Sequence, residues 1–105
     1  MKPDSRTIAE LVQRIVAVAN PIRIILFGSA AREEMTPDSD LDVLVVVPED
    51  QHQQDTTGDI YVNLIGFGVP VDVVVATEEE LRRYGNNFSL VYYPALREGK
   101  EIYAA

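Results

Sequence analysis

The hydrophobic and polar positions along the chain switch between a helical and an extended periodicity. Near the N-terminus, apolar residues recur at spacings of three and four, at Ile8, Leu11, Val12, Ile15 and Ala19. This spacing predicts a first helix, which Asp4 or Ser5 can cap. The helix should end before Pro21, because proline disfavours helical geometry in the residue before it.

Three apolar segments are short and end in turn-forming residues, which predicts strands. They span Ile22 to Phe27, Leu41 to Val47 and Val69 to Ala76. The middle segment is almost continuously apolar and β-branched, as in a strand that is buried on both faces. A fourth, shorter strand is expected from Glu101 to Tyr103.

Short helices are expected between these strands. Good helix formers directly after Ser29 predict a short helix there. Residues 35–39 are expected to be a loop, 49–57 form a polar stretch, and 60–65 are expected to be helical rather than extended.

Two further helices are expected near the C-terminus. Thr77 and Glu80 have the spacing of a capping box, in which each side chain pairs with a backbone N–H at a helix start. This predicts a helix to about Tyr84, and a last helix is expected from Phe88 to Glu98 with Gly99 as its C-cap. The order of elements predicts an α/β (α+β) domain with a small mixed sheet of three to four strands covered by helices.

Composition narrows the class of protein. The 105 residues suit a single domain, 1–105, and 47% hydrophobic with 25% charged residues is typical of a globular chain. The absence of cysteine excludes a disulfide scaffold, a cysteine-ligated zinc site and a thiol nucleophile. No apolar run approaches the ~18 residues that span a bilayer, and the N-terminus lacks the apolar core of a signal peptide. We therefore expect a cytoplasmic protein with no membrane partner.

The net charge of −8 limits the partners. A chain this acidic repels a phosphate backbone, so direct binding of nucleic acid is not expected. A nucleotide that carries a divalent metal can still bind.

Gly28 and Ser29 lie at the predicted junction between the first strand and the helix after it. Glycine allows a tight turn and a close backbone approach, and the unpaired N–H groups of a helix start attract phosphate. Serine adds a hydroxyl donor. The pair is a candidate phosphate cradle, and an ordinary turn with a capping serine is the alternative.

Asp40 and Asp42 flank Leu41 at the start of the second strand. Alternate residues of a strand point to one face, so the two carboxylates should project side by side. They repel each other unless a cation lies between them, and oxygen ligands suit Mg²⁺, with Mn²⁺ as the second candidate. A solvated acidic loop before a strand is the alternative.

Asp72 lies within the otherwise apolar third strand. A buried carboxylate is costly without a partner, and Asp72 can reach Asp40 and Asp42 if the third strand pairs beside the second. The alternative is an aspartate at the sheet edge that points into water. Three carboxylates beside a phosphate cradle are what two-metal phosphoryl or nucleotidyl transfer requires.

These residues together resemble the signature of the polymerase-beta-like nucleotidyltransferase superfamily: Gly-Ser, ten residues, Asp-x-Asp, and a later aspartate on a strand. The strings from Phe27 to Arg32 and from Ser39 to Val45 resemble its minimal nucleotidyltransferase (MNT) branch. The likeness runs from about Ile22 to Ala76, and Glu33 departs from it, because many members have glycine there. The resemblance implies a nucleotidyltransferase-like fold.

The resemblance also implies a role for each residue. Gly28 and Ser29 would bind the β- and γ-phosphates of ATP, the substrate. Asp40 and Asp42 would bridge two Mg²⁺ ions. Asp72 would hold the catalytic metal and help to deprotonate the acceptor hydroxyl, which attacks the α-phosphate as pyrophosphate leaves.

Other polar residues have simpler interpretations. Arg32 is assigned to the nucleotide site, and a surface ion pair with Glu or Asp is the alternative. His52 is expected at the surface, because metal ligation recruits neighbouring ligands. The acidic run Glu78–Glu80 suits a helix start rather than a metal site.

The predicted function is Mg²⁺-dependent transfer of a nucleotidyl group, AMP from ATP, to a hydroxyl. A chain of 105 residues has no second domain to grip an acceptor, which favours a protein as acceptor. The resemblance to the minimal branch implies a HEPN-family toxin as partner and this chain as its antitoxin, which modifies a tyrosine of the toxin. The charge of −8 suits a basic, RNA-cleaving partner.

Two alternatives stay open. One is a non-catalytic module of the same fold that masks its partner, and the retained aspartates count against it. The other is a small-molecule (antibiotic) nucleotidyltransferase whose acceptor site forms in a homodimer. The base preference, the acceptor, and the choice between a homo- and a hetero-oligomer do not follow from the sequence.

Overall fold

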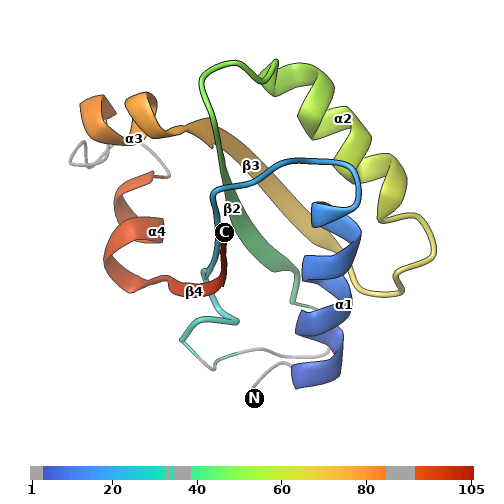
Figure 1. Ribbon diagram of the computed structural model, residues 1–105. Helices are drawn as coiled ribbons and strands as arrows, with labels where there is room; N and C mark the ends of the chain where they lie inside the picture. Colours follow the sequence, from blue (N-terminus) through green and yellow to red (C-terminus); the bar gives the residue numbers. More distant parts are fainter. Residues whose placement is uncertain (1–3, 33, 35–38, 85–91) are drawn as a thin grey trace.

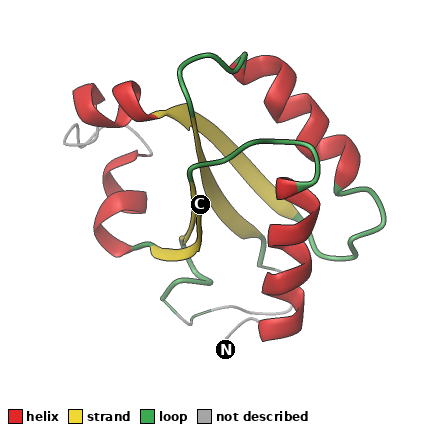
Figure 2. Ribbon diagram, in the orientation of Figure 1, coloured by secondary structure: helices red, strands yellow, loops and turns green. Residues whose placement is uncertain are grey.

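The apolar segments pair into one four-stranded sheet, in the order β3-β2-β1-β4. The strands are β1 (Arg23–Phe27), β2 (Leu41–Val47), β3 (Val71–Thr77) and β4 (Lys100–Ala104). β1 lies antiparallel to β2 and β4, whereas β3 lies parallel to β2. This computed structural model describes residues 4–32, 34, 39–84 and 92–105. The mixed sheet confirms the predicted fold class (Figure 1, Figure 2).

Two helices cover each face of the sheet. The helices are α1 (Ser5–Val16), α2 (Gln53–Asn63), α3 (Glu78–Tyr84) and α4 (Tyr92–Glu98). Apolar side chains of α1 and α2 pack on the odd-numbered residues of β2, such as Val43 and Val45. Those of α3 and α4 pack on the even-numbered residues, such as Leu44 and Val46. Both faces of β2 are therefore buried, as its continuous apolar sequence predicted.

Capping contacts place the helix starts. Asp4 caps α1 by accepting a hydrogen bond from the Arg6 N–H at 2.9 Å. The capping box of α3 forms as predicted: the Glu80 N–H donates to Thr77 Oγ1, and the Thr77 N–H donates to Glu80 Oε1, both at 3.2 Å. Such reciprocal pairs satisfy backbone donors that a helix start leaves open.

The second helix begins earlier than the predicted residue 60, within the polar stretch 49–57. His52 caps α2, because its Nδ1 accepts a hydrogen bond from the Asp55 N–H at 3.4 Å. Two residues of α2, Thr56 and Ile60, are buried. The helix therefore lacks the wide apolar stripe by which a helix is recognised in a sequence. His52 itself is exposed, as expected.

The predicted short helix after Ser29 is wrong. Residues 28–32 form a turn, in which the Arg32 N–H donates to the Gly28 carbonyl at 3.2 Å. The next bond, from the Glu34 N–H to the Ser29 carbonyl at 2.8 Å, spans five residues rather than four. The turn widens at this bond, which does not have the spacing of an α-helical hydrogen bond.

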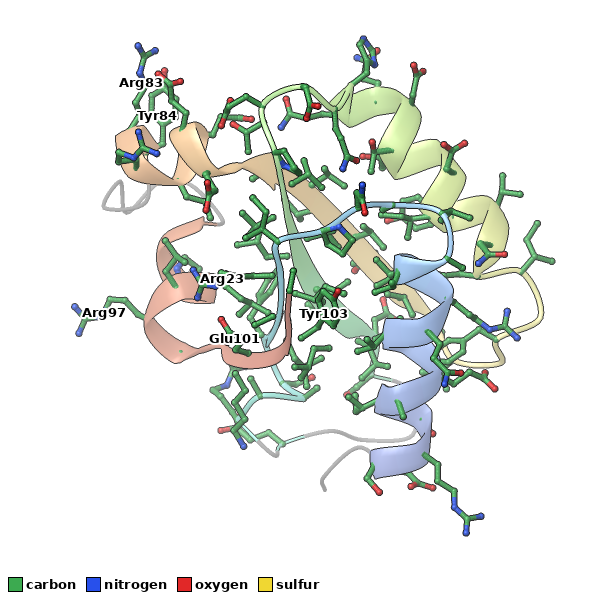
Figure 3. All side chains as sticks on the ribbon, viewed as in Figure 1. Arg23, Arg83, Tyr84, Arg97, Glu101 and Tyr103 are labelled. Carbon is green, nitrogen blue, oxygen red and sulfur yellow. The ribbon has the colours of Figure 1, made fainter. Side chains whose placement is uncertain are left out.

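The C-terminal strand forms the edge of the sheet beside β1. It is longer than the predicted segment, and Arg23 of β1 pairs with Glu101 of β4 at 2.7 Å (Figure 3). Some of the predicted segments lie outside the described residues: Glu33, residues 35–38 of the predicted loop 35–39, the segment 85–87 between the last two predicted helices, and residues 88–91 of the last one. The helices that the structure describes are all too short or too polar to cross a membrane.

Candidate active site

Two of the predicted site residues meet across neighbouring parallel strands. Asp42 of β2 is the register partner of Asp72 of β3. Leu44 and Ala76, further along the same two strands, pack together in the layer beneath α3 and α4. Because strand side chains alternate between faces, Asp42 and Asp72 point to that same face. The expectation that the third strand pairs beside the second is confirmed.

The exposure of Asp72 differs from the expectation. Its side chain is exposed, because β3 is an edge strand of the sheet. The reasoning from the cost of burying a carboxylate was therefore wrong, and the alternative of an aspartate at the sheet edge describes its surroundings. Asp72 nevertheless faces Asp42, so the predicted grouping of the two carboxylates holds.

The electrostatic surroundings of Asp42 give the clearest indication of a functional site. Partial burial raises the pKa of its carboxyl group, and the negative charges of Asp72 and Asp40 raise it further, with a hydrogen bond to Asp72. Arg32 acts in the opposite direction, as the smallest of these effects. Three carboxylates therefore concentrate negative charge around Asp42, and a bound cation would offset it.

Gly28 closes the site from the side of β1. Phe27, the residue before it, is the register partner of Asp42 across the two antiparallel strands. Gly28 has a φ of +71°, and a Cβ at this position would overlap the Asp42 carboxylate. Glycine is thus required both by the backbone conformation and by the close approach of Asp42. The Gly-Ser pair and the Asp-x-Asp pair, separated in the sequence, lie together.

The phosphate cradle is simpler than predicted. No helix begins at Ser29, so the predicted contribution of a helix N-terminus is missing from this part of the structure. The half-buried Ser29 and the turn over residues 28–32 remain beside Asp42 as hydrogen-bonding groups. Binding of phosphate by Gly28 and Ser29 stays a prediction.

Arg32 stands beside the carboxylates and also forms the surface ion pairs of its alternative interpretation. Its guanidinium contacts Glu34 at 3.2 Å and Glu98 at 3.4 Å, and all three side chains are exposed. The hydrogen bond to Glu34 is the main cause that raises the pKa of Arg32. A phosphate would have to compete with these two glutamates for the guanidinium.

The three aspartates offer the oxygen ligands that suit a hard divalent ion, although their side chains are not yet arranged to share one. Within the described part of the chain, no three His, Asp or Glu side chains stand close enough together to hold a metal ion. A site built from Asp40, Asp42 and Asp72 therefore requires their side chains to turn toward one another. Carboxylate oxygens are the ligands that Mg²⁺ prefers, and the pKa of Asp42 is raised by burial and by the charges of Asp72 and Asp40.

Two residues that sequence reasoning missed hold the strand that carries Asp72. Tyr61 of α2 accepts a hydrogen bond from the Val73 N–H at 2.9 Å, and Gln53 donates one to the Val75 carbonyl at 3.1 Å. Both contacts lie along the outer edge of β3, the edge that faces away from β2 and has no neighbouring strand. No local signal marks them, because Gln53 lies in a polar run and Tyr61 in a short apolar one.

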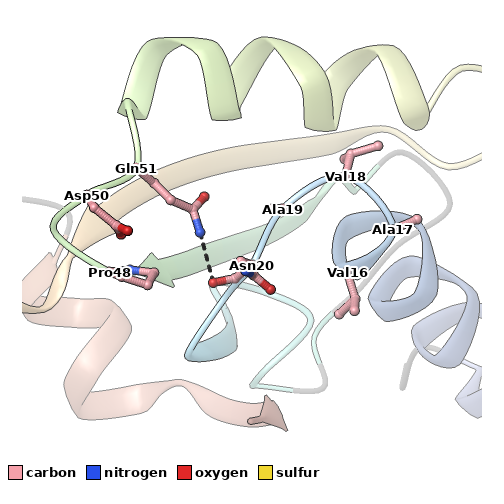
Figure 4. A pocket seen from close by; sticks show the side chains of 8 residues that line it. All are labelled: Val16, Ala17, Val18, Ala19, Asn20, Pro48, Asp50 and Gln51. Atoms are coloured by element: carbon pink, nitrogen blue, oxygen red, sulfur yellow. Dashed lines mark hydrogen bonds between the residues drawn. The ribbon is translucent and has the colours of Figure 1, made fainter.

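A hollow of about 560 Å³ lies at the other end of β2, away from the carboxylates (Figure 4). It lies between the segments 16–20 and 48–51, and Gln51 donates a hydrogen bond to the Asn20 carbonyl at 3.0 Å. Asp50 is the only acidic residue among those that line it, and Lys, Arg and His are absent from that lining. The chemistry therefore concentrates at the Asp42 end rather than at this hollow.

Comparison with known proteins identifies the family. A model of the nucleotidyltransferase domain matches residues 5–96. The chain belongs to the nucleotidyltransferase domain family. The match includes all six predicted site residues and confirms the expected enzyme class. No curated protein sequence matches the chain significantly.

Two solved structures share the fold of this nucleotidyltransferase domain. One, assigned as a nucleotidyltransferase from Sulfolobus solfataricus, has a TM-score of 0.56 at 23% identity, over 74% of this chain and 70% of that one. The other belongs to a mutant of the toxin–antitoxin pair MntA-HpeT, with a TM-score of 0.64 at 16% identity, over 98% of this chain and 75% of that one. At these identities the likeness shows the fold, and it is consistent with the minimal branch.

Proposed function

We propose that this nucleotidyltransferase moves AMP from ATP to a hydroxyl group of a protein partner, in the cytoplasm and with Mg²⁺. The observation that carries the proposal is the meeting of Asp42 with Asp72 across β2 and β3, with Gly28 against Asp42. Family membership supplies the reaction class, and the three carboxylates supply ligands for the metal.

Each residue has a task in this reaction. Asp40, Asp42 and Asp72 would hold Mg²⁺, which when bound neutralises charge on the phosphates. Gly28 leaves room for a phosphate beside the turn, and Ser29 offers a donor to it. The exposed Asp72 can accept the proton of the incoming hydroxyl, since solvent and substrate reach it.

In the transfer, one bond to the α-phosphorus forms, one breaks, and one proton moves. The acceptor oxygen forms a bond to the α-phosphorus of ATP, and the bond from that phosphorus to the bridging oxygen of pyrophosphate breaks. Pyrophosphate leaves, and the proton of the hydroxyl passes to the Asp72 carboxylate. The products are the adenylylated acceptor and pyrophosphate.

We further propose that the acceptor is a tyrosine of a HEPN-family toxin and that this chain acts as the antitoxin. The likeness to a chain of the MntA-HpeT toxin–antitoxin pair supports a toxin as partner. That structure is of a form in which two aspartates, two positions apart, are replaced by glutamate. Asp40 and Asp42 have the same spacing here.

The test is transfer of label from [α-³²P]ATP in the presence of Mg²⁺ and a purified HEPN-family protein encoded beside this chain. Label on the partner supports the proposal, and Asp72→Asn should reduce it by at least ~10²-fold, the lower end of what general-base catalysis contributes. Asp50→Asn is the matched control, because Asp50 is an exposed aspartate at the far hollow.

Two other outcomes would refute the proposed acceptor or the proposed chemistry. Label that appears on a small molecule and never on the partner would indicate a small-molecule nucleotidyltransferase. Growth protection by Asp72→Asn, with partner binding intact and no label on the partner, would indicate a masking module.

A further inference from the structure

Large apolar side chains are exposed at the C-terminal end of α2. Ile65 is 78% exposed and Val62 is 68% exposed, more than any other large apolar side chain in the described part of the chain. Tyr61, beside them, is 43% exposed. Their neighbours Leu64 and Phe67 pack against the core instead. The described part of the fold therefore leaves Val62 and Ile65 uncovered, although burying such side chains is favourable.

These side chains border an apolar groove. The groove has a volume of about 230 Å³ and is lined by Tyr61, Leu64, Ile65, Val69, Pro70 and Val71. No charged residue is among those that line it. Together with Val62, we call this the α2-end surface.

The α2-end surface adjoins the carboxylates. Val71 of the groove directly precedes Asp72, and it is the register partner of Leu41, which separates Asp40 from Asp42. The Leu41 N–H also donates to the Pro70 carbonyl at 2.9 Å. The groove lies on the face of the sheet that α1 and α2 cover, whereas Asp72 points to the other face. Because β3 is an edge strand and Asp72 is exposed, a molecule that docks in the groove can reach Asp72 around the start of β3.

The elements that form the α2-end surface carry acidic and no basic side chains. α2 contains Asp55 and Asp59 and β3 contains Asp72, with no Lys or Arg in either element. Residues 64–70, which join them, carry no charged side chain. Arg23, Arg83 and Arg97 lie on the other side, near α3 and α4 (Figure 3).

One cation approaches the α2-end surface from α1, and it is already engaged. Arg14 donates to the carbonyls of Asn63 at 3.2 Å and Ile65 at 3.0 Å, and it pairs with Glu10 at 3.5 Å. It therefore holds the end of α2, and the carboxylate of Glu10 offsets its charge. A second copy docked here would bring acidic groups against acidic groups, which opposes association.

We propose that the α2-end surface is where the acceptor protein docks, through a segment with apolar side chains flanked by Lys or Arg. The inference rests on the proposed function and adds the place and chemistry of acceptor recognition. Apolar residues of the partner fill the groove and cover Val62 and Ile65. Basic residues beside them pair with the acidic side chains of α2 and β3, and the acceptor hydroxyl reaches Asp72 around the start of β3, the edge strand.

The probe is a fluorescent synthetic helical peptide with Leu at helical spacing, Lys elsewhere and one Tyr, and its affinity is read by anisotropy without ATP. The variant Val62→Gln/Ile65→Gln should weaken binding by about ten-fold or more, as loss of two central apolar contacts does. The matched control is Val16→Gln/Val18→Gln, which alters side chains 37% and 39% exposed at the far hollow. This control should change affinity less than about two-fold.

A peptide with Glu in place of Lys should bind at least about ten-fold more weakly, and salt should weaken the binding of the Lys peptide. Equal binding by the two protein variants, or no binding at all, overturns the docking surface. So does a wild-type dimer that Val62→Gln/Ile65→Gln converts to a monomer, because a second copy then occupies the surface.

The outcomes also separate this inference from the proposed function. With Mg-ATP, transfer to the peptide tyrosine that is unchanged in Val62→Gln/Ile65→Gln refutes the docking surface and keeps the enzyme. Binding that is lost in this variant, without transfer to any acceptor, supports the docking surface and refutes the proposed chemistry.

Discussion

Replacing Gly28 by alanine tests whether the turn and the carboxylates touch. Gly28 has a φ of +71°, and an added Cβ would overlap the carboxylate of Asp42. The left-handed backbone costs an L-residue about 1–2 kcal/mol. Pushing Asp42 off its rotamer costs about 0.5–1.5 kcal/mol more. Alanine also restricts the unfolded chain, which returns about 0.4–1 kcal/mol. We expect Gly28→Ala to destabilise the protein by about 0.5–3 kcal/mol in all.

Gly66 is the matched control for the backbone part of this cost. Its φ is +84°, and an added Cβ would have no atom within 4 Å. Gly66→Ala should therefore show the backbone strain alone, about 0–1.5 kcal/mol after the unfolded-state gain. In an Asp42→Ala background, Gly28→Ala should behave like Gly66→Ala. The Cβ of residue 42 lies 3.5 Å from the added methyl group, an ordinary contact.

The measurement is urea unfolding followed by circular dichroism, with the four proteins of the Gly28 and Asp42 cycle and the Gly66 control. A coupling of about 0.5–1.5 kcal/mol between Gly28→Ala and Asp42→Ala is expected, as for residues in contact. In thermal unfolding, each kcal/mol should appear as roughly 4–8 °C. A coupling of zero, with Gly28→Ala no costlier than Gly66→Ala, would show that the turn does not approach Asp42.

Three further predictions concern the site and its supports. Asp42→Asn should raise the metal-free melting temperature at neutral pH and remove stabilisation by Mg²⁺. The pKa of Asp42 is raised in the folded protein, so its charged carboxylate destabilises the fold. This effect should be absent below pH 3.8, the usual pKa of the group, and should grow as the pH rises through the raised pKa. The melting temperatures of Asp42→Asn and of the unchanged protein should therefore converge in acid. Tyr61→Phe should cost about 1 kcal/mol in urea unfolding, because the Val73 N–H loses its partner, and equal stability would contradict the bond. Thr77→Ala should cost about 1 kcal/mol in the same measurement by opening the capping box, whereas Thr57→Ala, which removes a bond inside α2, leaves the box intact.

The sequence contained enough to predict the strands and the pairing of the site. The segment Leu41 to Val47 is continuously apolar, and a strand so composed is recognised because both of its faces are covered. Asp42 and Asp72 were expected to meet if their strands were neighbours, and the register shows that the strands are. The strands themselves follow from side-chain periodicity, which is local information, whereas the grouping of the aspartates was implied by the family resemblance.

The features that failed depend on the order of the strands or on local hydrogen bonds that periodicity and helix propensity do not describe. The exposure of Asp72 depends on β3 being an edge strand, and nothing within the strand itself states the sheet order. The start of α2 depends on a histidine cap and on few buried residues, so the helix lacks an apolar stripe. The turn after Ser29 differs from a helix by one hydrogen bond that spans five residues, a difference that helix propensity does not encode.

The position of β3 at the sheet margin has a consequence for how activity would be lost. Val71 and Asp72 begin this strand, and they are less buried than Val73 and Val75, which follow. Local opening starts where few apolar contacts hold the chain, so this end should fray at a lower free energy than global unfolding. Fraying would separate Asp72 from Asp42 while β1 and β2 stay folded. Warming should then abolish nucleotidyl transfer at a temperature below that of global unfolding. A partner bound in the adjoining groove would raise that temperature by holding the start of β3 in place.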